Sequence, residues 1–545
     1  MNRPIRIAFF LAAIMALTAC GNKDLNTKVS NTTGWNYYDR GTTNFEALAG
    51  VTGVTPIGTV PIQGGTFMVG DKDEFITAPR DRSQRSVTVS SFYMDKYEVT
   101  TLNWREYRHW MEIVFGPVAP ELVQKMLPDS TVWREEMAYN EPYVEEYFNN
   151  RAFSFYPIVG ITWDQAMAYC RWRTDRVNER ALWGAGAIAM PPFEELKPIS
   201  DETARENWEN RTGYTMDEFE VEGPDPETGE LTSITMFRPS YEYIRDKFVF
   251  NTEKYLYDGS YQPAVGSNPK VDSYDNPRKV NRQDGILVVG YRLPTEAEWE
   301  FAAYAPLAGD DGLTIEGKVY PWSGYHPRNL TDKQRGQMQA NFVRGRGDMM
   351  GVSGALNDRY VITNPVDAFA PNDFGLYNMA GNVNEWVLDV YRETSNKVTS
   401  EYNSFRGNVY TRPKRTDNGD GTSSYTLDSI GGFELEYSAE DDKRGFKDGD
   451  LESMIVTNYP LDSATYPVQD LIALYNLAEG LEIKQDPTDI LAPRITDKTR
   501  VIKGGSWRDR IYWLNPSTRR YIDQDKCSST IGFRCAVSAI GDEIK

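Results

Sequence analysis

The sequence predicts an α+β fold, because strand-like and helix-like segments occur together in a chain long enough for a large core. Residues 87–94, Val-Thr-Val-Ser-Ser-Phe-Tyr-Met, are typical of a strand. Residues 100–114 predict a helix. The chain has 545 residues, of which 13% are aromatic and 25% charged, so it can bury a sizeable core. Length alone would allow several domains.

Threonine caps mark the start of two further helices. Thr162 is a candidate N-cap, and Gln165, three residues on, completes a capping box. This helix is expected to end near residue 173. Thr295 caps another helix, with Glu296 and Glu298 placed favourably near its positive end.

The N-terminus predicts a targeting segment. Two arginines precede an apolar run at residues 8–17, which is too short for a comfortable membrane span. Leu-Thr-Ala-Cys then fits a bacterial lipobox, which implies a lipoprotein signal peptide at 1–19, cleavage before Cys20 and a diacylglycerol on its sulfur. Residues 20–55 would form a lipid-anchored tether, and Gly21 favours the outer membrane. An ordinary secretory peptide is the alternative.

The charge balance disfavours a nucleic-acid partner. Lys and Arg number 59 against 79 Asp and Glu, which gives a net charge of −20. No basic footprint of the kind that phosphates need is evident. The excess of acidic groups favours solubility and is compatible with cation binding.

Residues 365–386, PVDAFAPNDFGLYNMAGNVNEW, gather oxygen-bearing side chains around a glycine. Asn378, Asn382 and Glu385 offer side-chain oxygens, the carbonyl of Ala380 offers a fourth, and Gly381 allows a tight turn. Calcium prefers such a set of carboxylate and carbonyl oxygens on a loop. A turn rich in Asn and Gly that binds no ion is the competing interpretation.

This stretch resembles the signature of the formylglycine-generating enzyme, or sulfatase-modifying factor, family. Six other blocks typical of that family occur in order, namely residues 61–68 (PIQGGTFM), 95–100 (DKYEVT), 157–163 (PIVGITW), 292–300 (RLPTEAEWE), 503–507 (KGGSW) and 531–535 (IGFRC). The resemblance implies one α+β domain over residues 56–540 with the family's C-type-lectin-like fold and long ordered loops. Two large insertions, at about 174–291 and 387–499, would interrupt it.

The same resemblance indicates where the cysteines needed for oxidase chemistry would lie. Enzymes of the family use two cysteines just after the Gly-Gly-Ser element, which bind copper and activate oxygen. Aligned without a gap, those positions are Asp509 and Leu514 here, and neither side chain supplies a soft thiolate. We therefore expect no copper and no enzyme. The alternative is a divergent oxidoreductase or protein-modifying enzyme that uses Asp509, Arg510 and Ser506.

The resemblance also implies two structural calcium sites and a disulfide. The first calcium site would use the side chain of Asn341 and the carbonyl of Phe342, with the side chain of Asp358 and the carbonyl of Tyr360. The second would use the oxygens described above, those of Asn378, Ala380, Asn382 and Glu385. Cys170 and Cys535 match two cysteines that are disulfide-bonded in the family, and Cys527 is left as a buried thiol or an intermolecular link.

The insertions carry features that a plain loop would not need. Residues 201–230 hold eleven acidic residues and also Trp208 and Phe219. A solvated acidic loop and a surface that contacts a partner are both compatible with this composition, and the aromatics favour the second. Residues 410–427 predict a hairpin around Asp-Asn-Gly-Asp-Gly.

Within the family, the tether sequence TTGWNYYD and the segments PDSTVWREEMAYNEPYVEEYF and CRWRTDRVNE resemble gliding-motility lipoproteins of Bacteroidota. The resemblance implies a non-catalytic scaffold of the gliding-motility and type IX secretion machinery. The protein would sit in the outer membrane through its lipid, facing the periplasm. Its partners would be other lipoproteins and ring components of that machinery, with no nucleic acid involved.

Overall fold

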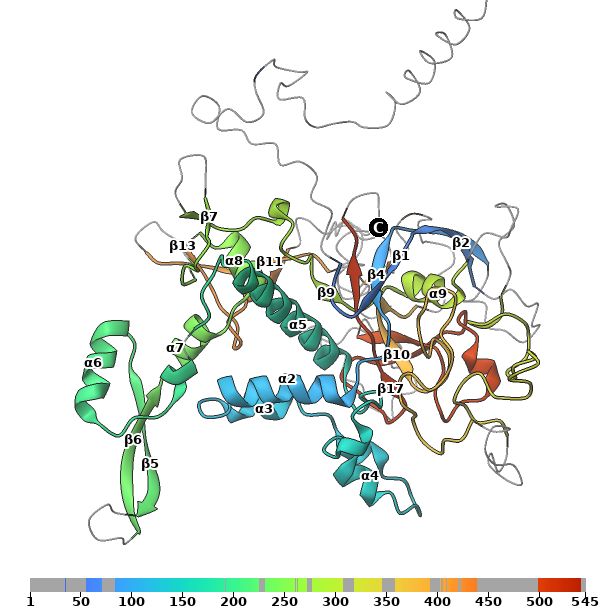
Figure 1. Ribbon diagram of the computed structural model, residues 1–545, viewed down its shortest axis with the longest axis horizontal. Coiled ribbons are helices and arrows are strands. Elements are labelled where there is room, and N and C mark those ends of the chain that lie inside the picture. Colours follow the sequence, from blue (N-terminus) through green and yellow to red (C-terminus); the bar gives the residue numbers. More distant parts are fainter. Residues whose placement is uncertain are drawn as a thin grey trace, which may run out of the picture.

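Two four-stranded sheets lie side by side at the centre of the molecule (Figure 1). The computed structural model describes residues 35, 55–70, 84–191, 193–224, 231–259, 261, 263–271, 277–306, 318–345, 358–392, 402, 405–407, 409–419, 423–438 and 498–540. The first sheet has the order β1 (Thr59–Ile62), β4 (Phe92–Asp95), β18 (Ala536–Ser538) and β9 (Tyr291–Arg292), all antiparallel. Strands from both ends of the domain are therefore hydrogen-bonded neighbours.

The second sheet has the order β16 (Arg520–Asp523), β15 (Thr499–Lys503), β10 (Asn384–Val390) and β17 (Ile531–Gly532). Only the pair β10 and β17 is parallel within this sheet. The second insertion joins β10 to β15, and these two strands pair directly. A long insertion between paired strands leaves the sheet intact, because the closure entropy of a loop grows slowly with its length. The mixture of sheets and helices confirms the predicted α+β class.

The predicted strand at 87–94 is two strands that belong to different sheets. β3 (Arg85–Val89) pairs with β2 (Gly65–Val69), whereas β4 pairs with β1. The chain changes sheets at Ser90 and Ser91, where Gly64 approaches it closely. A Cβ on Gly64 would lie 2.3 Å from the carbonyl oxygen of Val89, so only glycine fits there.

The structure confirms where the predicted helices begin. Helix α2 (Thr101–Val114) follows its N-cap Thr100, and α5 (Trp163–Gly184) begins with the predicted capping box of Thr162 and Gln165. Helix α9 (Glu296–Tyr304) has the same kind of box at Thr295. The predicted end of α5 near residue 173 is wrong, because neither Gly nor Pro interrupts the chain before Gly184.

Large aromatic side chains fill the core between these helices and the sheets. Trp104 of α2 stacks on Tyr169 of α5 at 5.4 Å between ring centroids, and Phe533 packs edge-on against both. A second cluster lies between α9 and the first sheet around Trp299. The remaining short helical segments outside the insertions are α3 (Pro120–Lys125), η3 (Ser130–Trp133), α4 (Glu141–Glu146), η4 (Arg151–Phe153) and η10 (Ile511–Leu514).

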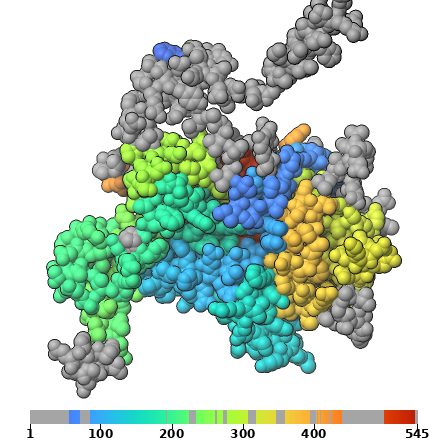
Figure 2. All heavy atoms as spheres, viewed as in Figure 1, coloured from blue at the N-terminus to red at the C-terminus, as the bar shows by residue number. Residues whose placement is uncertain are grey.

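The first insertion builds a lobe of its own. Figure 2 shows part of it, in green, projecting from one end of the molecule. Residues 202–239 supply that projection as a helix followed by a long hairpin. The elements in this insertion are η5 (Phe193–Leu196), α6 (Glu202–Thr212), β5 (Met216–Pro224), β6 (Leu231–Pro239), α7 (Tyr241–Tyr243), the π-helical turn η6 (Ile244–Phe248), α8 (Thr252–Tyr257), β7 (Lys270–Val271), β8 (Pro277–Arg278) and η7 (Arg282–Asp284).

The second insertion forms two short ladders. The predicted hairpin is confirmed in its inner part, where β12 (Arg415–Asp417) pairs with β13 (Ser423–Tyr425). Its outer part differs, since β11 (Thr411–Pro413) pairs with β14 (Leu435–Tyr437). The two insertions meet, because the hydroxyl of Tyr241 donates a hydrogen bond to the carbonyl of Ser429.

Candidate functional site

A fully buried ion pair occupies the centre of the domain. The guanidinium of Arg534 donates to both carboxylate oxygens of Glu385, at 2.6 and 2.7 Å, and the two side chains are 0% and 1% exposed. The indole of Trp299 donates a third hydrogen bond to Glu385 at 2.8 Å. Strand β10 supplies Glu385, and the chain after β17 supplies Arg534, so this pair ties the second sheet to the first.

Glu98 joins this network from the block before α2. The side-chain amides of Asn378 and Asn382 donate to its Oε2 at 3.0 and 2.7 Å. Its other oxygen, Oε1, is buried without a hydrogen-bond partner among the described residues. Burial, and next the charge of Glu385, raise the pKa of Glu98 to about 8. Glu98 is therefore mainly protonated near neutral pH, and Arg534 and Glu385 balance each other.

Sequence reasoning missed Glu98 and Arg534, although both lie in blocks that it quoted. The available signal was a charged residue enclosed by apolar neighbours, in Tyr-Glu-Val and in Phe-Arg-Cys. Charged residues are almost never fully buried unless they are paired, so each of these predicts a buried partner. Nothing in the sequence alone identifies which acid and which base meet.

The second candidate calcium set fits an ion poorly in this structure. Both oxygens of Glu385 are taken by Arg534 and Trp299, and Oδ1 of Asn382 accepts from the backbone N–H of Asn364 at 2.9 Å. A cation bound by Glu385 would have to replace or approach a guanidinium. Of this set, the carbonyl of Ala380 accepts no hydrogen bond in the described part of the chain.

The first candidate calcium set has more oxygen atoms to offer. Asn341 uses its amide nitrogen on the carbonyl of Ile362 and on Asn364, which leaves Oδ1 as an acceptor. Asp358 is a buried carboxylate, 3% exposed, that accepts from the backbone N–H of Tyr360 at 3.2 Å. The carbonyls of Phe342 and Tyr360 accept no hydrogen bond in the residues described. Carbonyl oxygens that accept no hydrogen bond are hard ligands of the kind that calcium prefers.

A third charged cluster lies just after the Gly-Gly-Ser element. Asp509 makes a bidentate ion pair with Arg520, at 2.8 and 2.5 Å, and accepts from the hydroxyl of Ser506 at 2.6 Å. Asn384 contacts both partners. Burial alone would raise the pKa of Asp509, but the hydrogen bonds and charge of Arg520 outweigh it and hold that pKa below its usual value.

The neighbours of this cluster do not form a shared reactive site. Leu514 is fully buried in an apolar cluster with Met338 and Phe342. Arg510 is exposed to solvent. Within the described residues, no group of three or more His, Cys, Asp or Glu side chains is placed to hold a metal ion. Both carboxylate oxygens of Asp509 accept hydrogen bonds, so the arrangement around it is a satisfied ion pair.

Comparison with known proteins assigns most of the chain to a known domain family. Residues 46–431 match the Sulfatase-modifying factor enzyme 1-like domain. This match covers more than half of the chain. The chain belongs to the sulfatase-modifying factor family.

Curated relatives include active and inactive members of this family. The formylglycine-generating enzyme of Mus musculus is 29% identical over 201 residues, which is 32% of this chain and 49% of that protein. The enzyme of Thermomonospora curvata is 44% identical over 100 residues, which is 18% of this chain and 27% of the relative. The inactive C-alpha-formylglycine-generating enzyme 2 of Bos taurus is 38% identical over 104 residues, 19% of this chain and 28% of that one. The chain thus spans about half or less of each relative.

Among solved structures, PvdO from Pseudomonas aeruginosa aligns over 88% of this chain and 94% of its own, with 14% identity and a TM-score of 0.35.

The cysteines of this sulfatase-modifying-factor domain are thiols in the structure. Cys170 and Cys535 are buried and free, and their sulfurs lie 3.5 Å apart, well beyond the roughly 2.0 Å of a disulfide bond. The predicted pair is therefore adjacent but not bonded. Cys527 is half-buried beside Asp129, and burial, followed by that carboxylate, raises its pKa to about 11. A thiol with so high a pKa reacts slowly.

The two aromatics proposed to contact a partner differ in burial. Trp208 is only 8% exposed and packs edge-on against Tyr243 at 4.6 Å, so it holds the lobe together and is not available as a contact residue. Phe219, on β5, is half-buried beneath the guanidinium of Arg238. Cys20 lies outside the described residues. No helix among those residues is both long enough and apolar enough to cross a membrane.

Proposed function

We propose that this protein is a non-catalytic scaffold of the sulfatase-modifying factor family. The observation that carries the proposal is the state of the two positions that the resemblance assigns to the copper-binding cysteines. One is Asp509, held in an ion pair with Arg520, and the other is Leu514, fully buried in the core. Copper(I) needs soft ligands such as thiolates, and these two side chains offer none. No observation favours the alternative of a divergent modifying enzyme.

The scaffold role is assigned to gliding motility and type IX secretion. The support is the sequence resemblance to gliding-motility lipoprotein J, which includes the tether and insertion segments. The folded lobe at residues 202–239 adds to this support, because it projects from the domain where another protein could reach it (Figure 2). Its proposed partners are other lipoproteins and ring components of the machinery at the outer membrane.

The test removes the projecting hairpin without disturbing its base. Glu218 and Phe237 pair directly, and Phe237 also bridges Ile199 at the base, so a Gly-Gly-Ser bridge can replace residues 219–236 and leave that contact in place. We expect this variant to reach normal abundance but to lose secretion and gliding in the native cell. The matched variant is Asp509→Asn, which should retain both activities per folded molecule. The opposite pattern, together with copper-dependent oxygen consumption on a cysteine peptide, would establish the enzyme alternative.

Membrane attachment is proposed to depend on Cys20. The acyl chains of a lipoprotein supply the apolar surface that anchors it, facing the periplasm from the outer membrane. Cys20→Ala should therefore move the protein from the membrane to the soluble fraction. Complete retention of this variant in the membrane fraction would assign attachment to partner proteins.

We propose that calcium is a structural ion bound by the first candidate set, which includes Asn341 and Asp358. A cation that binds only the folded state stabilises it by mass action, about 2.7 kcal/mol at a hundredfold excess over its dissociation constant. Calcium should raise the melting temperature of the wild type, and Asp358→Asn should remove that response. The matched variant is Glu385→Gln, which should lower stability but leave the calcium response in place. A response lost in Glu385→Gln and kept in Asp358→Asn would transfer the site to the second set.

A further inference from the structure

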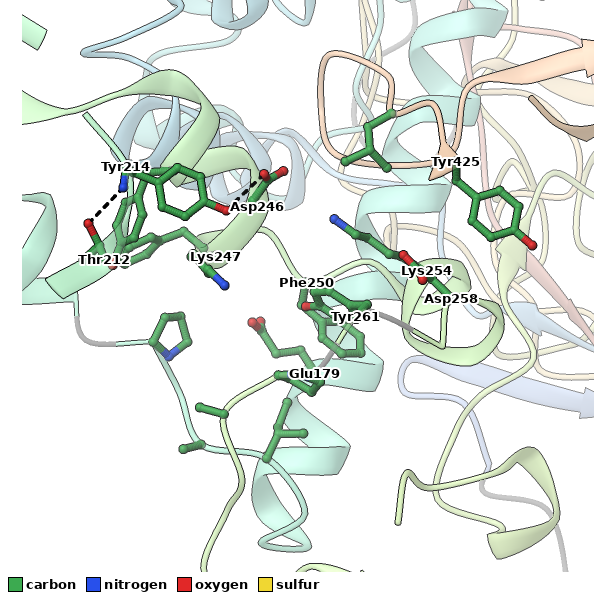
Figure 3. Close-up of a pocket in the computed structure, with 18 of the residues that line it drawn as sticks. Glu179, Thr212, Tyr214, Asp246, Lys247, Phe250, Lys254, Asp258, Tyr261 and Tyr425 are labelled. Carbon is green, nitrogen blue, oxygen red and sulfur yellow. Dashed lines mark hydrogen bonds between the residues drawn. The ribbon is translucent and has the colours of Figure 1, made fainter. Parts of the chain in front are cut away.

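A large cavity lies between the two insertions, away from the clusters described above. Its volume is about 980 Å³, at the upper end of the usual range for ligand pockets. The end of α5, the end of α6, the η6 turn, α8 and strand β13 all contribute to its wall. Figure 3 shows its polar and aromatic lining, which includes Glu179, Tyr214, Lys247, Lys254, Tyr261 and Tyr425.

Two lysines direct their ammonium groups into this cavity (Figure 3). Lys254 of α8 is 8% exposed, yet its ammonium meets no hydrogen-bond acceptor in the described part of the chain. Its one recorded contact is with the face of Tyr261, at 5.0 Å from the ring centroid. Lys247 of the η6 turn is exposed and lies 5.9 Å from the ring of Tyr214. An ammonium that faces a cavity and forms no ion pair with a described residue offers a position for an anion.

The acidic residues around the cavity already have partners. Glu179 pairs with Arg176 at 2.7 Å, and Asp246 pairs with Arg245 at 3.1 Å. Asp258 also has an interaction partner. Arg211, the third basic residue of the wall, pairs with Glu195 at 3.0 Å. Lys247 and Lys254 thus form no ion pair with any described residue, in a chain whose net charge is −20.

Burial is the main influence on Lys254. It lowers the pKa of the ammonium, while the charges of Asp246 and Asp258 act in the opposite direction. A carboxylate placed beside the ammonium would favour its charged form in the same way. An anionic ligand would therefore offset part of the effect of burial on the ammonium of Lys254.

The other walls suit a peptide. Tyr214, Tyr243, Tyr261 and Tyr425 present ring faces and hydroxyl groups. Strand β13 belongs to a two-stranded sheet, so one of its edges has no strand beside it among the described residues. An edge strand can accept an extended peptide through main-chain hydrogen bonds. The π-helical turn at Ile244–Phe248 carries Lys247, and such turns occur frequently at functional sites.

We propose that this cavity binds an acidic peptide segment, with its carboxylates on Lys247 and Lys254 and its apolar side chains against the tyrosines. This inference goes beyond the scaffold role and does not depend on it. Residues of both insertions line the cavity, and a bound segment would hold the two insertions together.

The test uses the purified full-length protein in detergent and a fluorescent peptide, acetyl-Asp-Phe-Asp-Phe-Asp. We expect saturable binding by fluorescence anisotropy, weakened by salt because exposed charges are screened. The same peptide with Lys in place of Asp should not bind. Lys247→Gln combined with Lys254→Gln should weaken binding at least tenfold, and Tyr425→Ala should weaken it from the side of the second insertion.

The matched control is Lys197→Gln, at an exposed lysine that pairs with Glu194 outside the cavity. It should bind the peptide as the wild type does. If the variants at Lys254 fail to fold, Lys247→Glu serves instead, because that side chain is exposed. Binding that is unchanged in Lys247→Glu, or equal for the acidic and the basic peptide, would overturn the proposal. So would the absence of binding by the wild type.

Discussion

The buried pair of Arg534 and Glu385 and the cavity lysines Lys247 and Lys254 present charge in opposite ways. Arg534 is fully buried and donates four hydrogen bonds, two to Glu385 and one each to the carbonyls of Tyr377 and Asp95. Lys254 is almost as buried, yet its ammonium has no carboxylate partner in the residues described. Glu385 and Arg534 lie in sequence blocks that resemble the family, whereas Lys247 and Lys254 lie in the segment at about 174–291 that we expect to be an insertion.

The difference indicates where this chain keeps its capacity for binding. A buried ion pair with both partners satisfied is structural, because it holds segments together and has no free group. The Asp509 and Arg520 pair follows the same pattern at the edge of the domain. An ammonium that faces a cavity and forms no ion pair with a described residue can pair with the carboxylate of a ligand. The insertions, then, are the part of this domain where recognition is expected.

Breaking the central pair should have the largest effect. Arg534→Met keeps most of the side-chain volume but leaves Glu385 as a buried charge without its partner. We expect a loss of about 3 to 5 kcal/mol in the free energy of unfolding, measured with denaturant. Arg412→Met, which removes an exposed pair with Glu436, should change stability by less than about 1 kcal/mol. Equal effects of the two substitutions would contradict the contrast between core and surface.

The second prediction concerns the lobe of the first insertion. Trp208→Ala removes a buried indole that packs on Tyr243, which typically costs about 3 to 5 kcal/mol where the surroundings cannot collapse. Hydrogen exchange should accelerate in residues 202–239 and stay slow in α9. The matched control is Trp183→Ala, at a tryptophan of α5 that is 54% exposed. Faster exchange in α9 as well would mean that the lobe and the core unfold together.

The third prediction tests a buried carboxyl at the base of the first insertion. Burial raises the pKa of Asp175 to about 6, although Thr252 donates hydrogen bonds to it. The folded state thus binds this proton more tightly than the unfolded state. Its contribution to stability is complete below about pH 4 and is lost as pH rises through 6.

Asp175→Asn should therefore match the wild type near pH 4 and exceed its stability by roughly 2 kcal/mol at pH 7.5. Denaturant unfolding at the two pH values measures this. If Asp175→Asn destabilises the protein more at pH 7.5 than at pH 4, the direction assigned to the pKa shift of Asp175 is wrong.

The smallest effect is expected at Asp509. Asp509→Asn keeps the acceptor for Ser506 but removes the charge that pairs with Arg520, and both side chains are partly exposed. We expect a loss of about 1 to 2 kcal/mol in thermal or denaturant unfolding. Secretion and gliding should follow protein abundance only. Loss of both activities at wild-type abundance and stability would show that Asp509 takes part in chemistry or partner binding.

Local chemistry made several elements predictable from the sequence. The threonine caps of α2, α5 and α9 depend on residues within three positions of one another, so the sequence alone identifies their starts. The break at Ser90, by contrast, depends on neighbours distant in sequence. A strand-like run gives no indication of which sheet each half will join. In the structure the run divides at Ser90 and Ser91, where the backbone of Gly64 lies against it.

The candidate site divides in the same way. By itself, the sequence identified the oxygen-rich loop and the residues Asp509 and Leu514 after the Gly-Gly-Ser element, and the bounds of the insertions stay a prediction. Only the tertiary structure decided that Arg534 pairs with Glu385, that Trp208 faces inward and that Lys254 forms no ion pair with a described residue. The reason is that the charge state and availability of a buried group depend on what packs around it. Those neighbours come from segments as far apart as Glu98, Glu385 and Arg534.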